Sequence, residues 1–318
     1  RTHATRANLN NLIGVPLTIL EAPDDVQALV IEAGASVPGE IGRARDIIAP
    51  SVGVVTNVSA GHVQGFGSVA GVLAEKVSLL KDVALAVVGT EPAELAVRAQ
   101  SVARKTVTAG LAPAAGAHPE RWTLGPDACA LLTFRGHEAR LPLPGRHQAE
   151  NAMLALAVAE ALELDLGRAT EALRHVNVPS GRSEIISAGG LTIMHDAYNA
   201  NPASLAAALE AIRAMRARGR RLVVVVGSML ELGPDAPARH AEAAEWVMAL
   251  QPDLIGAVGD FVAPLERHPE LGDRLVTAKD ADQLGARLKA RLRGDELVLL
   301  KASRGMRLER VLPHLLST

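Results

Sequence analysis

The stretch that decides the fold is His195-Asp196-Ala197-Tyr198-Asn199-Ala200-Asn201-Pro202-Ala203-Ser204. It follows an apolar run at 191–194 that is typical of a buried strand, and it precedes a strongly patterned helix. An acid, a phenol and two amides therefore gather where a strand ends and a helix begins. In open α/β sheets small molecules bind at this edge, so the stretch predicts both an α/β sheet and a binding site.

The helix that follows has a clear start. Asn201 suits the N-cap and Pro202 the first helical position. Leu205, Leu209 and Ile212 then form an apolar stripe along one face. Free backbone N–H groups at such a helix start favour an anion, which again indicates a ligand at the end of the preceding strand.

Short β-branched runs alternate with Ala- and Leu-rich stretches along the rest of the chain. This rhythm predicts βαβ units and a mostly parallel, doubly wound sheet. It breaks between 106 and 143, where the runs 128–134 and 138–143 flank Arg135-Gly136-His137 and predict a β-hairpin insert, followed by a helix at 148–162. Turn formers at 178–183 predict a linker, with strands resuming at Leu191, so we expect domains at 1–182 and 183–318. The expected parallel strands are 28–31, 52–58, 85–88, 191–194, 222–226, 254–258 and 297–300.

Composition excludes several classes of protein. The chain has 318 residues, 48% of them hydrophobic, with a net charge of −2 and only 2% aromatics. These values argue against a nucleic-acid partner, and no apolar run is long enough for membrane insertion. The single cysteine, Cys129, excludes an internal disulfide and favours a reducing compartment such as the cytoplasm.

Three polar residues in the first half are candidates for a metal or catalytic site. Glu32 directly follows a predicted strand and could hold Mg²⁺, or it could be a helix cap or surface acid. His62 lies in a turn of hydroxyl and amide residues, where it could equally be structural. Lys76, one of only six lysines, falls on the apolar face of a helix expected at 68–81. It needs a partner or becomes reactive, unless its stem only covers the helix edge.

Other candidates stand at helix starts and strand ends. His147 and Asn151 share one face at the start of the helix after the hairpin, and Arg182 lies in the linker. Lys301, Ser303 and Arg304 follow the last strand and suit an anionic ligand such as a carboxylate. Each of these positions also has a plain structural explanation as a cap, a turn or a solvated charge. The amide-rich run at 8–11, which includes Asn8 and Asn11, could bind sugar hydroxyls or form Asx turns.

Taken in order, these motifs resemble the Mur ligase family, and most closely its branch that adds D-alanyl-D-alanine. The matching runs are NLNNLIGVP at 8–16, IEAGASVPGEI at 31–41, TNVSAGHVQGFGS at 56–68, LPGRHQAENAMLA at 143–155, DAYNANPASLAAAL at 196–209, GSMLELG at 227–233 and KASRGM at 301–306. The resemblance implies a central ATPase-type parallel sheet with a hairpin insert, followed by a Rossmann-like C-terminal domain. It implies a monomer that uses ATP and Mg²⁺ to join D-alanyl-D-alanine to UDP-N-acetylmuramoyl-tripeptide through an acyl phosphate.

The resemblance also implies roles for individual residues. Glu32, His62 and Lys76 match the metal-site and catalytic positions, with Lys76 as the carbamylated lysine. The nucleotide would meet His147, Asn151, Arg182 and Asp196. The substrates would meet Asn8, Asn11, Asn199, Asn201, Lys301 and Ser303.

The sequence departs from the family in two large features. The Gly-Lys-Thr phosphate loop is absent, and so is the N-terminal domain that holds the UDP group. We therefore expect the chain to represent the C-terminal two-thirds of the enzyme and to be inactive without the phosphate loop. Two other interpretations remain. One is a Mur-type ligase for another amino acid, although the YNANP run argues against the branch that adds a diamino acid. The other is a non-catalytic nucleotide- or peptide-binding module.

Overall fold

The computed structural model describes residues 1–59, 63–177, 179–217 and 219–316. It divides into two compact units. The first comprises Arg1–His118 and Met153–Glu163, and the second comprises Pro119–Ala152 and Leu164–Thr318. Within the described ranges, no helix is both long and apolar enough to cross a membrane.

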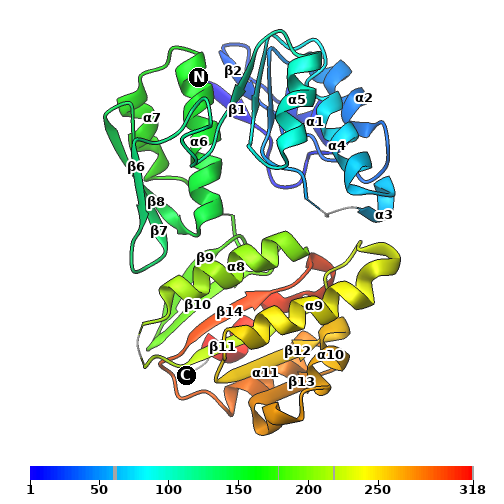
Figure 1. The fold of residues 1–318 in the computed structure, drawn as a ribbon, viewed down its shortest axis with the longest axis vertical. Helices are drawn as coiled ribbons and strands as arrows, with labels where there is room; N and C mark the ends of the chain where they lie inside the picture. The colour runs from blue at the N-terminus through cyan, green and yellow to red at the C-terminus, as the bar shows by residue number, and fades with distance from the viewer. Residues whose placement is uncertain (60–62, 178, 218, 317–318) are drawn as a thin grey trace. The chain divides into compact units, whose positions relative to one another are not determined.

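The first unit contains two small parallel sheets (Figure 1). Strand β1 (Thr2–Ala4) pairs with β2 (Ala28–Val30), and β3 (Val52–Val55), β4 (Leu85–Val88) and β5 (Thr106–Thr108) form the other sheet in that order. The apolar residues of β3 and β4 pack against the helix that precedes β4 in the chain and the helix that follows it, as the predicted βαβ rhythm requires. These helices and their neighbours are α1 (Gly14–Leu20), α2 (Glu40–Ile48), α3 (Val63–Phe66), α4 (Val69–Ser78) and α5 (Ala93–Val102).

The predicted hairpin insert is present in the second unit. Strands β7 (Cys129–Phe134) and β8 (His137–Pro144) are antiparallel, and β6 (Arg121–Leu124) adds a third strand. The two-residue turn has positive φ at both Arg135 and Gly136, which matches the right-handed twist of the flanking strands. Two helices follow, α6 (Arg146–Ala161), whose last residues belong to the first unit, and α7 (Leu166–Leu173).

A six-stranded sheet forms the rest of the second unit, in the order β13-β12-β11-β14-β10-β9. Strands β10 (Leu191–Asp196), β11 (Leu222–Val226), β12 (Leu254–Val258) and β14 (Leu297–Lys301) are parallel, as predicted. Strand β13 (Leu275–Ala278), which was not predicted, pairs parallel with β12 at the edge of the sheet. The prediction that strands resume at Leu191 was wrong, because β9 (Glu184–Ala188) comes first and pairs antiparallel with β10. Its burial alternates along an edge strand, so it lacks the continuous apolar run of the central strands.

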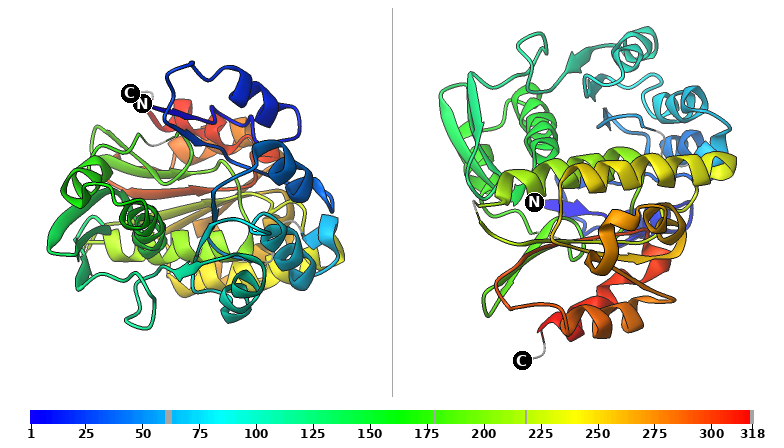
Figure 2. Two further views of the ribbon diagram at one scale, coloured as in Figure 1. Left: turned by 90° about the horizontal axis from the view of Figure 1, so that it is seen from above. Right: turned by 60° about the horizontal axis from the view of Figure 1, so that its bottom comes forward.

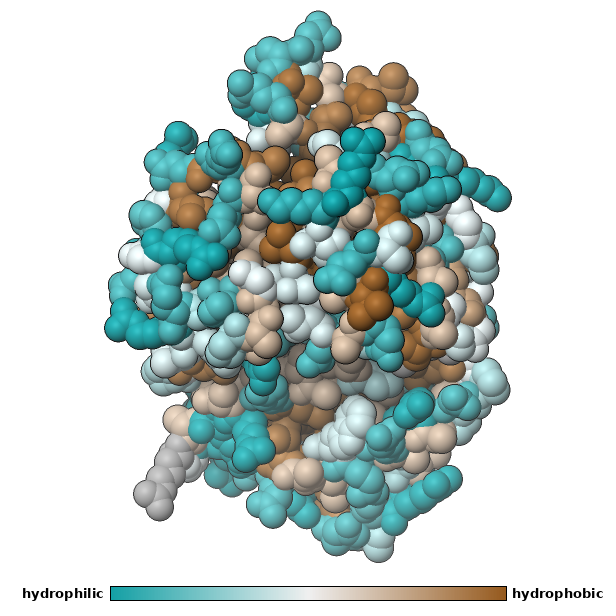
Figure 3. Space-filling model, turned by 45° about the horizontal axis from the view of Figure 1, so that its top comes forward, coloured by the Kyte–Doolittle hydropathy of each residue, from teal (hydrophilic) through white to brown (hydrophobic). Residues whose placement is uncertain are grey.

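Helices cover both faces of this sheet (Figures 1 and 2). Its apolar side chains point alternately to two cores, one on each face. Val224 and Val226 face α8 (Pro202–Met215) and α9 (Ala236–Ala249), whereas Val223 and Val225 face α11 (Ala281–Lys289) and the C-terminal helix α12 (Leu312–Leu316). A short helix, α10 (Val262–Glu266), extends the first core. Burial on both faces explains why the central strands β11 and β14 consist almost entirely of Val and Leu. On the outside, apolar patches are interrupted by polar side chains (Figure 3).

A buried carboxylate secures the entry to β14. The Glu296 side chain is 0% exposed, and it accepts hydrogen bonds from the backbone N–H groups of Arg293 (2.7 Å) and Gly294 (2.9 Å). Arg221 donates to the same carboxylate at 2.7 Å. Burial alone would raise the pKa of Glu296, but these N–H donors and the charge of Arg221 together lower it.

We expect Glu296→Gln to lower the free energy of unfolding at neutral pH by about 2–3 kcal/mol, since a charged acceptor is lost from several donors. A lowered folded-state pKa means that the carboxylate stabilises the fold above its ordinary value of 4.5 and loses this effect as pH falls through the folded pKa. Urea unfolding at neutral and acidic pH should therefore show the difference between variant and wild type shrinking on acidification. The exposed Glu266→Gln serves as control and should change stability by less than about 0.5 kcal/mol. A difference independent of pH would contradict this assignment.

Candidate functional site

A buried ion pair joins the carboxyl ends of β10 and β14. Asp196 and Lys301 are opposite each other in the sheet register, and Lys301 Nζ lies 2.6 Å from Asp196 Oδ2. The Lys301 side chain is only 3% exposed, and its Nζ also donates to the carbonyl oxygen of Asn199 at 2.8 Å. Such a charge is tolerated in the interior only because it has both a counter-ion and a further hydrogen bond. The structure thus brings together two of the predicted site residues, which are far apart in the sequence.

The other oxygen of Asp196 holds the turn that carries Arg182. Asp196 Oδ1 accepts a hydrogen bond from the Ser183 backbone N–H at 2.9 Å, and Tyr198 N–H donates to the Gly181 carbonyl at 2.9 Å. Gly181 has φ +77°, and a Cβ there would lie 3.2 Å from the Tyr198 nitrogen. The Arg182 guanidinium lies 4.2 Å from the centre of the Tyr198 ring. The predicted linker is therefore a fixed turn tied to the end of β10.

A second polar pair, Glu184 and His195, contacts this turn and was not predicted from the sequence. Glu184 Oε2 accepts from Ser180 Oγ at 2.8 Å and from Gly181 N–H at 3.2 Å, and it lies 3.3 Å from Nδ1 of the buried His195. Burial would raise the pKa of Glu184, but these hydrogen bonds and the neighbouring His195 lower it. The pair could be found only by placing β9 beside β10, and β9 was not predicted.

The side chains in this region that were predicted to bind the dipeptide make hydrogen bonds to nearby groups of the protein instead. Asn199 is exposed, and its Oδ1 accepts from Ala200 N–H at 2.9 Å. Asn201 caps α8 in a capping box with Ser204, as the sequence predicts. Ser303 is buried, accepts from Leu230 N–H at 2.9 Å and donates to the Ala200 carbonyl at 3.2 Å. Contacts between these side chains and a substrate stay a prediction.

His147 lies in the electrostatic neighbourhood of the same ion pair. Burial lowers the pKa of His147, the negative charge of Asp196 opposes that effect, and the positive charge of Lys301 adds to it. Its Nδ1 is buried and has no hydrogen-bond partner in the part of the chain that the structure describes. Asn151, one turn further along α6, is exposed and donates to Gln148 Oε1 at 3.4 Å. Contacts between these two residues and a nucleotide stay a prediction.

In the first unit, Lys76 is half-buried on the apolar face of α4, as predicted. The same helix buries Val72, Leu73 and Val77. Lys76 Nζ donates to the carbonyl oxygen of Asn57 at 2.8 Å, just beyond the end of β3. Burial lowers the pKa of Lys76, and it has no carboxylate counter-ion among the described residues. This environment shifts the protonation equilibrium of Lys76 toward the neutral amine, compared with a lysine in water.

Glu32 is exposed after β2, and its side chain has a hydrogen-bond partner that was not predicted. Asn10 Nδ2 donates to Glu32 Oε1 at 2.8 Å, and Gly34 leaves the space that the Asn10 amide occupies. Asn11, in contrast, uses its Oδ1 to accept from the N–H groups of Ile13 and Gly14 at the start of α1. Asn8 is exposed. The Asn10–Glu32 contact was missed because it depends on the pairing of β1 with β2.

The predicted metal site is described only in part. His62 lies outside the described residues. Among the described residues, no group of three or more His, Cys, Asp or Glu side chains could hold a metal ion. Glu32 nevertheless offers the hard oxygen atoms that Mg²⁺ prefers, with the Asn10 amide beside it.

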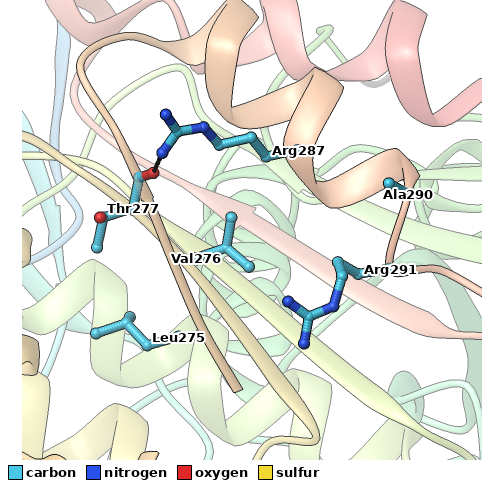
Figure 4. A pocket seen from close by; sticks show the side chains of 6 residues that line it. All are labelled: Leu275, Val276, Thr277, Arg287, Ala290 and Arg291. Atoms are coloured by element: carbon cyan, nitrogen blue, oxygen red, sulfur yellow. Dashed lines mark hydrogen bonds between the residues drawn. The ribbon is translucent and has the colours of Figure 1, made fainter. Parts of the chain in front are cut away.

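A shallow depression between β13 and α11 is a different kind of feature (Figure 4). Arg287 donates to the Thr277 carbonyl at 2.5 Å, and Arg291 donates to the Asp273 carbonyl at 2.7 Å. These arginines satisfy carbonyl groups beside an edge strand at the opposite side of the sheet from β9. The depression therefore has a structural explanation and is separate from the Asp196–Lys301 pair.

Comparisons with known proteins agree over the whole chain. Residues 1–159 match the Mur ligase middle domain, and residues 181–304 match the Mur ligase, glutamate ligase domain. The UDP-N-acetylmuramoyl-tripeptide–D-alanyl-D-alanine ligase of Bacillus subtilis (strain 168) is 31% identical over 334 residues, which cover 100% of this chain and 70% of that protein. The ligase of the same name from Escherichia coli (strain K12) is 29% identical, covering 96% of this chain and 69% of its own length.

Solved structures show the same fold. A crystal structure of MurF from Acinetobacter baumannii superposes with a TM-score of 0.87 at 27% identity, covering 100% of this chain and 71% of that one. The MurF ligase of Thermotoga maritima in complex with ADP gives a TM-score of 0.83 at 24% identity, with 99% and 73% coverage. The α/β architecture expected from the sequence is confirmed.

We expect Asp196→Asn to destabilise the fold by about 3–5 kcal/mol, because it leaves the Lys301 charge buried without a counter-ion. Lys301→Met should cost less, and the double variant Asp196→Asn, Lys301→Met should recover much of the loss. Urea unfolding of the four proteins measures the coupling directly. Lys279→Met, at an exposed lysine, controls for the substitution itself. Additive losses in the double variant would show that the two side chains do not stabilise each other.

Proposed function

The chain belongs to the Mur ligase family, and from that premise we propose that it joins D-alanyl-D-alanine to UDP-N-acetylmuramoyl-tripeptide at the expense of ATP. The match to ligases of this name along the entire chain carries the proposal. It is supported by the polar groups at the carboxyl ends of β10 and β14, where α/β sheets bind small molecules. The chain is thus a ligase of peptidoglycan precursor synthesis.

The reaction needs two steps in which charge must be controlled. A substrate carboxylate oxygen attacks the γ-phosphorus of ATP, forming an acyl phosphate and releasing ADP. The amine of the dipeptide then attacks the acyl carbon, an amide bond forms, and phosphate leaves with its electron pair. We assign Arg182, Asp196, His147 and Asn151 to the nucleotide. The exposed Arg182 is the cation for phosphate, since the charge of Lys301 is already neutralised by Asp196.

The first unit would supply the metal-binding and catalytic groups. Glu32, His62 and Lys76 would together hold Mg²⁺. The bound Mg²⁺ would neutralise negative charge on the phosphate groups. The neutral amine of Lys76 would add to CO₂ and lose one proton, which gives a carbamate anion in place of the amine. The lowered pKa of Lys76 and its lack of a carboxylate partner among the described residues support this assignment. Asn8 and Asn11 would face the nucleotide-sugar substrate.

We also propose a functional division into domains at 1–182 and 183–318. The two family matches, which end at 159 and begin at 181, support this boundary. The turn at Ser180–Ser183 lies at the start of the second match and is held by hydrogen bonds to Asp196 and Glu184. The expectation of a monomer stays a prediction.

We expect phosphate release from ATP to require both the muramyl tripeptide and D-alanyl-D-alanine in the protein as the cell makes it. Each substrate omitted in turn is the control, since the acyl phosphate and the amine act in sequence. A coupled phosphate assay and mass spectrometry of the ligated product measure the outcome. Release with another amino acid in place of the dipeptide would assign a different Mur-type ligase. Nucleotide binding without release would favour a non-catalytic module.

We expect Lys76→Ala to abolish turnover in the same protein, because neither amine nor carbamate remains. Short-chain carboxylic acids should restore part of the activity by supplying a carboxylate in the vacated space. Lys81→Ala, at an exposed lysine just beyond α4, is the matched control and should keep wild-type activity. Near-full activity of Lys76→Ala would contradict the carbamate assignment. Lost activity that no carboxylic acid restores would limit Lys76 to a positioning role.

A further inference from the structure

One phenol ring holds two arginines near the carboxyl edge of the six-stranded sheet. Tyr198 is the chain's single tyrosine, in the loop after β10. The Arg182 guanidinium lies 4.2 Å from its ring centre and that of Arg304, in the loop after β14, lies 5.3 Å away. Arg304 Nη1 also donates to the phenol oxygen at 3.3 Å. We call these three residues the Arg–Tyr–Arg cluster.

The cluster carries positive charge that the surrounding protein does not neutralise. Neither Arg182 nor Arg304 has a carboxylate within ion-pair distance among the described residues. The nearby carboxylates serve other groups: Asp196 pairs with Lys301, and Glu184 bonds to Ser180, Gly181 and His195. Stacking on an aromatic ring contributes only about 0.5–1 kcal/mol at an exposed site and does not replace a counter-ion.

The phenol group has donor capacity left. Its oxygen accepts from Arg304, and within the described ranges its own O–H hydrogen has no acceptor. Guanidinium groups match the planar geometry of a carboxylate, and a phenol O–H can add a third donor to the same anion. The cluster therefore presents the donors that an oxyanion needs.

Lys301 cannot serve as the exposed cation of this loop. The run KASRGM at 301–306 predicts an anion site, yet Lys301 is 3% exposed and already paired. Arg304 is the exposed cation of the same run, and Tyr198 positions it. The anion-binding role that the sequence pattern suggests for the loop thus falls to Arg304.

We propose that Arg304 and Tyr198 bind the terminal carboxylate of the amine substrate and thereby select a dipeptide with a free C-terminus. This inference rests on the proposed function. Arg182, the other arginine of the cluster, remains assigned to the nucleotide. A cation that fixes the far end of the dipeptide leaves its amine free to attack, and a site built for a carboxylate discriminates against an uncharged end.

The test uses steady-state kinetics of the protein as the cell makes it. Arg304→Gln should raise the KM for D-alanyl-D-alanine about 10- to 100-fold, the usual effect of losing a charge-assisted hydrogen bond, while the KM for ATP stays within about twofold. Wild type should use D-alanyl-D-alaninamide far less well than the free acid, and Arg304→Gln should lose most of this preference. Tyr198→Phe should show a smaller change in the same direction, and Arg304→Lys should be intermediate.

Arg307→Gln is the matched control, since Arg307 is also exposed and follows in the same loop. It should leave both KM values unchanged, and equal Tm values would show that every variant folds. A raised KM for ATP with an unchanged KM for the dipeptide would overturn the proposal and make the cluster a phosphate site. Unchanged values for both substrates would overturn it as well. Failure of the ligase function itself would be seen separately, as absent dipeptide-dependent phosphate release in wild type.

Discussion

The ion pair between Asp196 and Lys301 is the constraint on which the site in the second unit depends. It ties the last residues of two neighbouring strands, and each partner also holds a loop, since Asp196 binds the Arg182 turn and Lys301 binds the Asn199 carbonyl. Because the Lys301 side chain is only 3% exposed, water molecules cannot replace Asp196 as its partner. The backbone around the site is therefore positioned by charge as well as by packing.

A buried lysine and a half-buried lysine in this chain have different surroundings. Lys301 has a carboxylate partner, with Asp196 Oδ2 at 2.6 Å from its Nζ. Lys76 has only the carbonyl of Asn57, and burial lowers its pKa. The first arrangement suits a fixed structural cation, and the second suits a group that reacts in its neutral form. The contrast depends on a single neighbouring carboxylate, which sequence patterns do not reveal.

Local signals in the sequence predicted much of the fold. Continuous Val and Leu runs marked the central strands, Arg135-Gly136 marked the hairpin, and Asn201-Pro202 marked the start of α8. The edge strand β9 was not predicted, because two of its five residues are exposed and its apolar pattern is weak. Contacts such as Asn10 with Glu32 or Glu184 with His195 were not predicted either, because they depend on strand pairing rather than on neighbours in sequence. Candidate site residues could thus be named from the sequence, but their hydrogen-bond partners required the fold.

The presence of one tyrosine, placed between two guanidinium groups, has a practical consequence. Isotope labelling of tyrosine alone would give a single set of aromatic resonances, and all of them would originate from this loop. Ring-current shifts act in the other direction and would mark the Arg182 and Arg304 side chains. The chain therefore contains a natural spectroscopic reporter at its proposed substrate edge, free of background from any other residue of the same type.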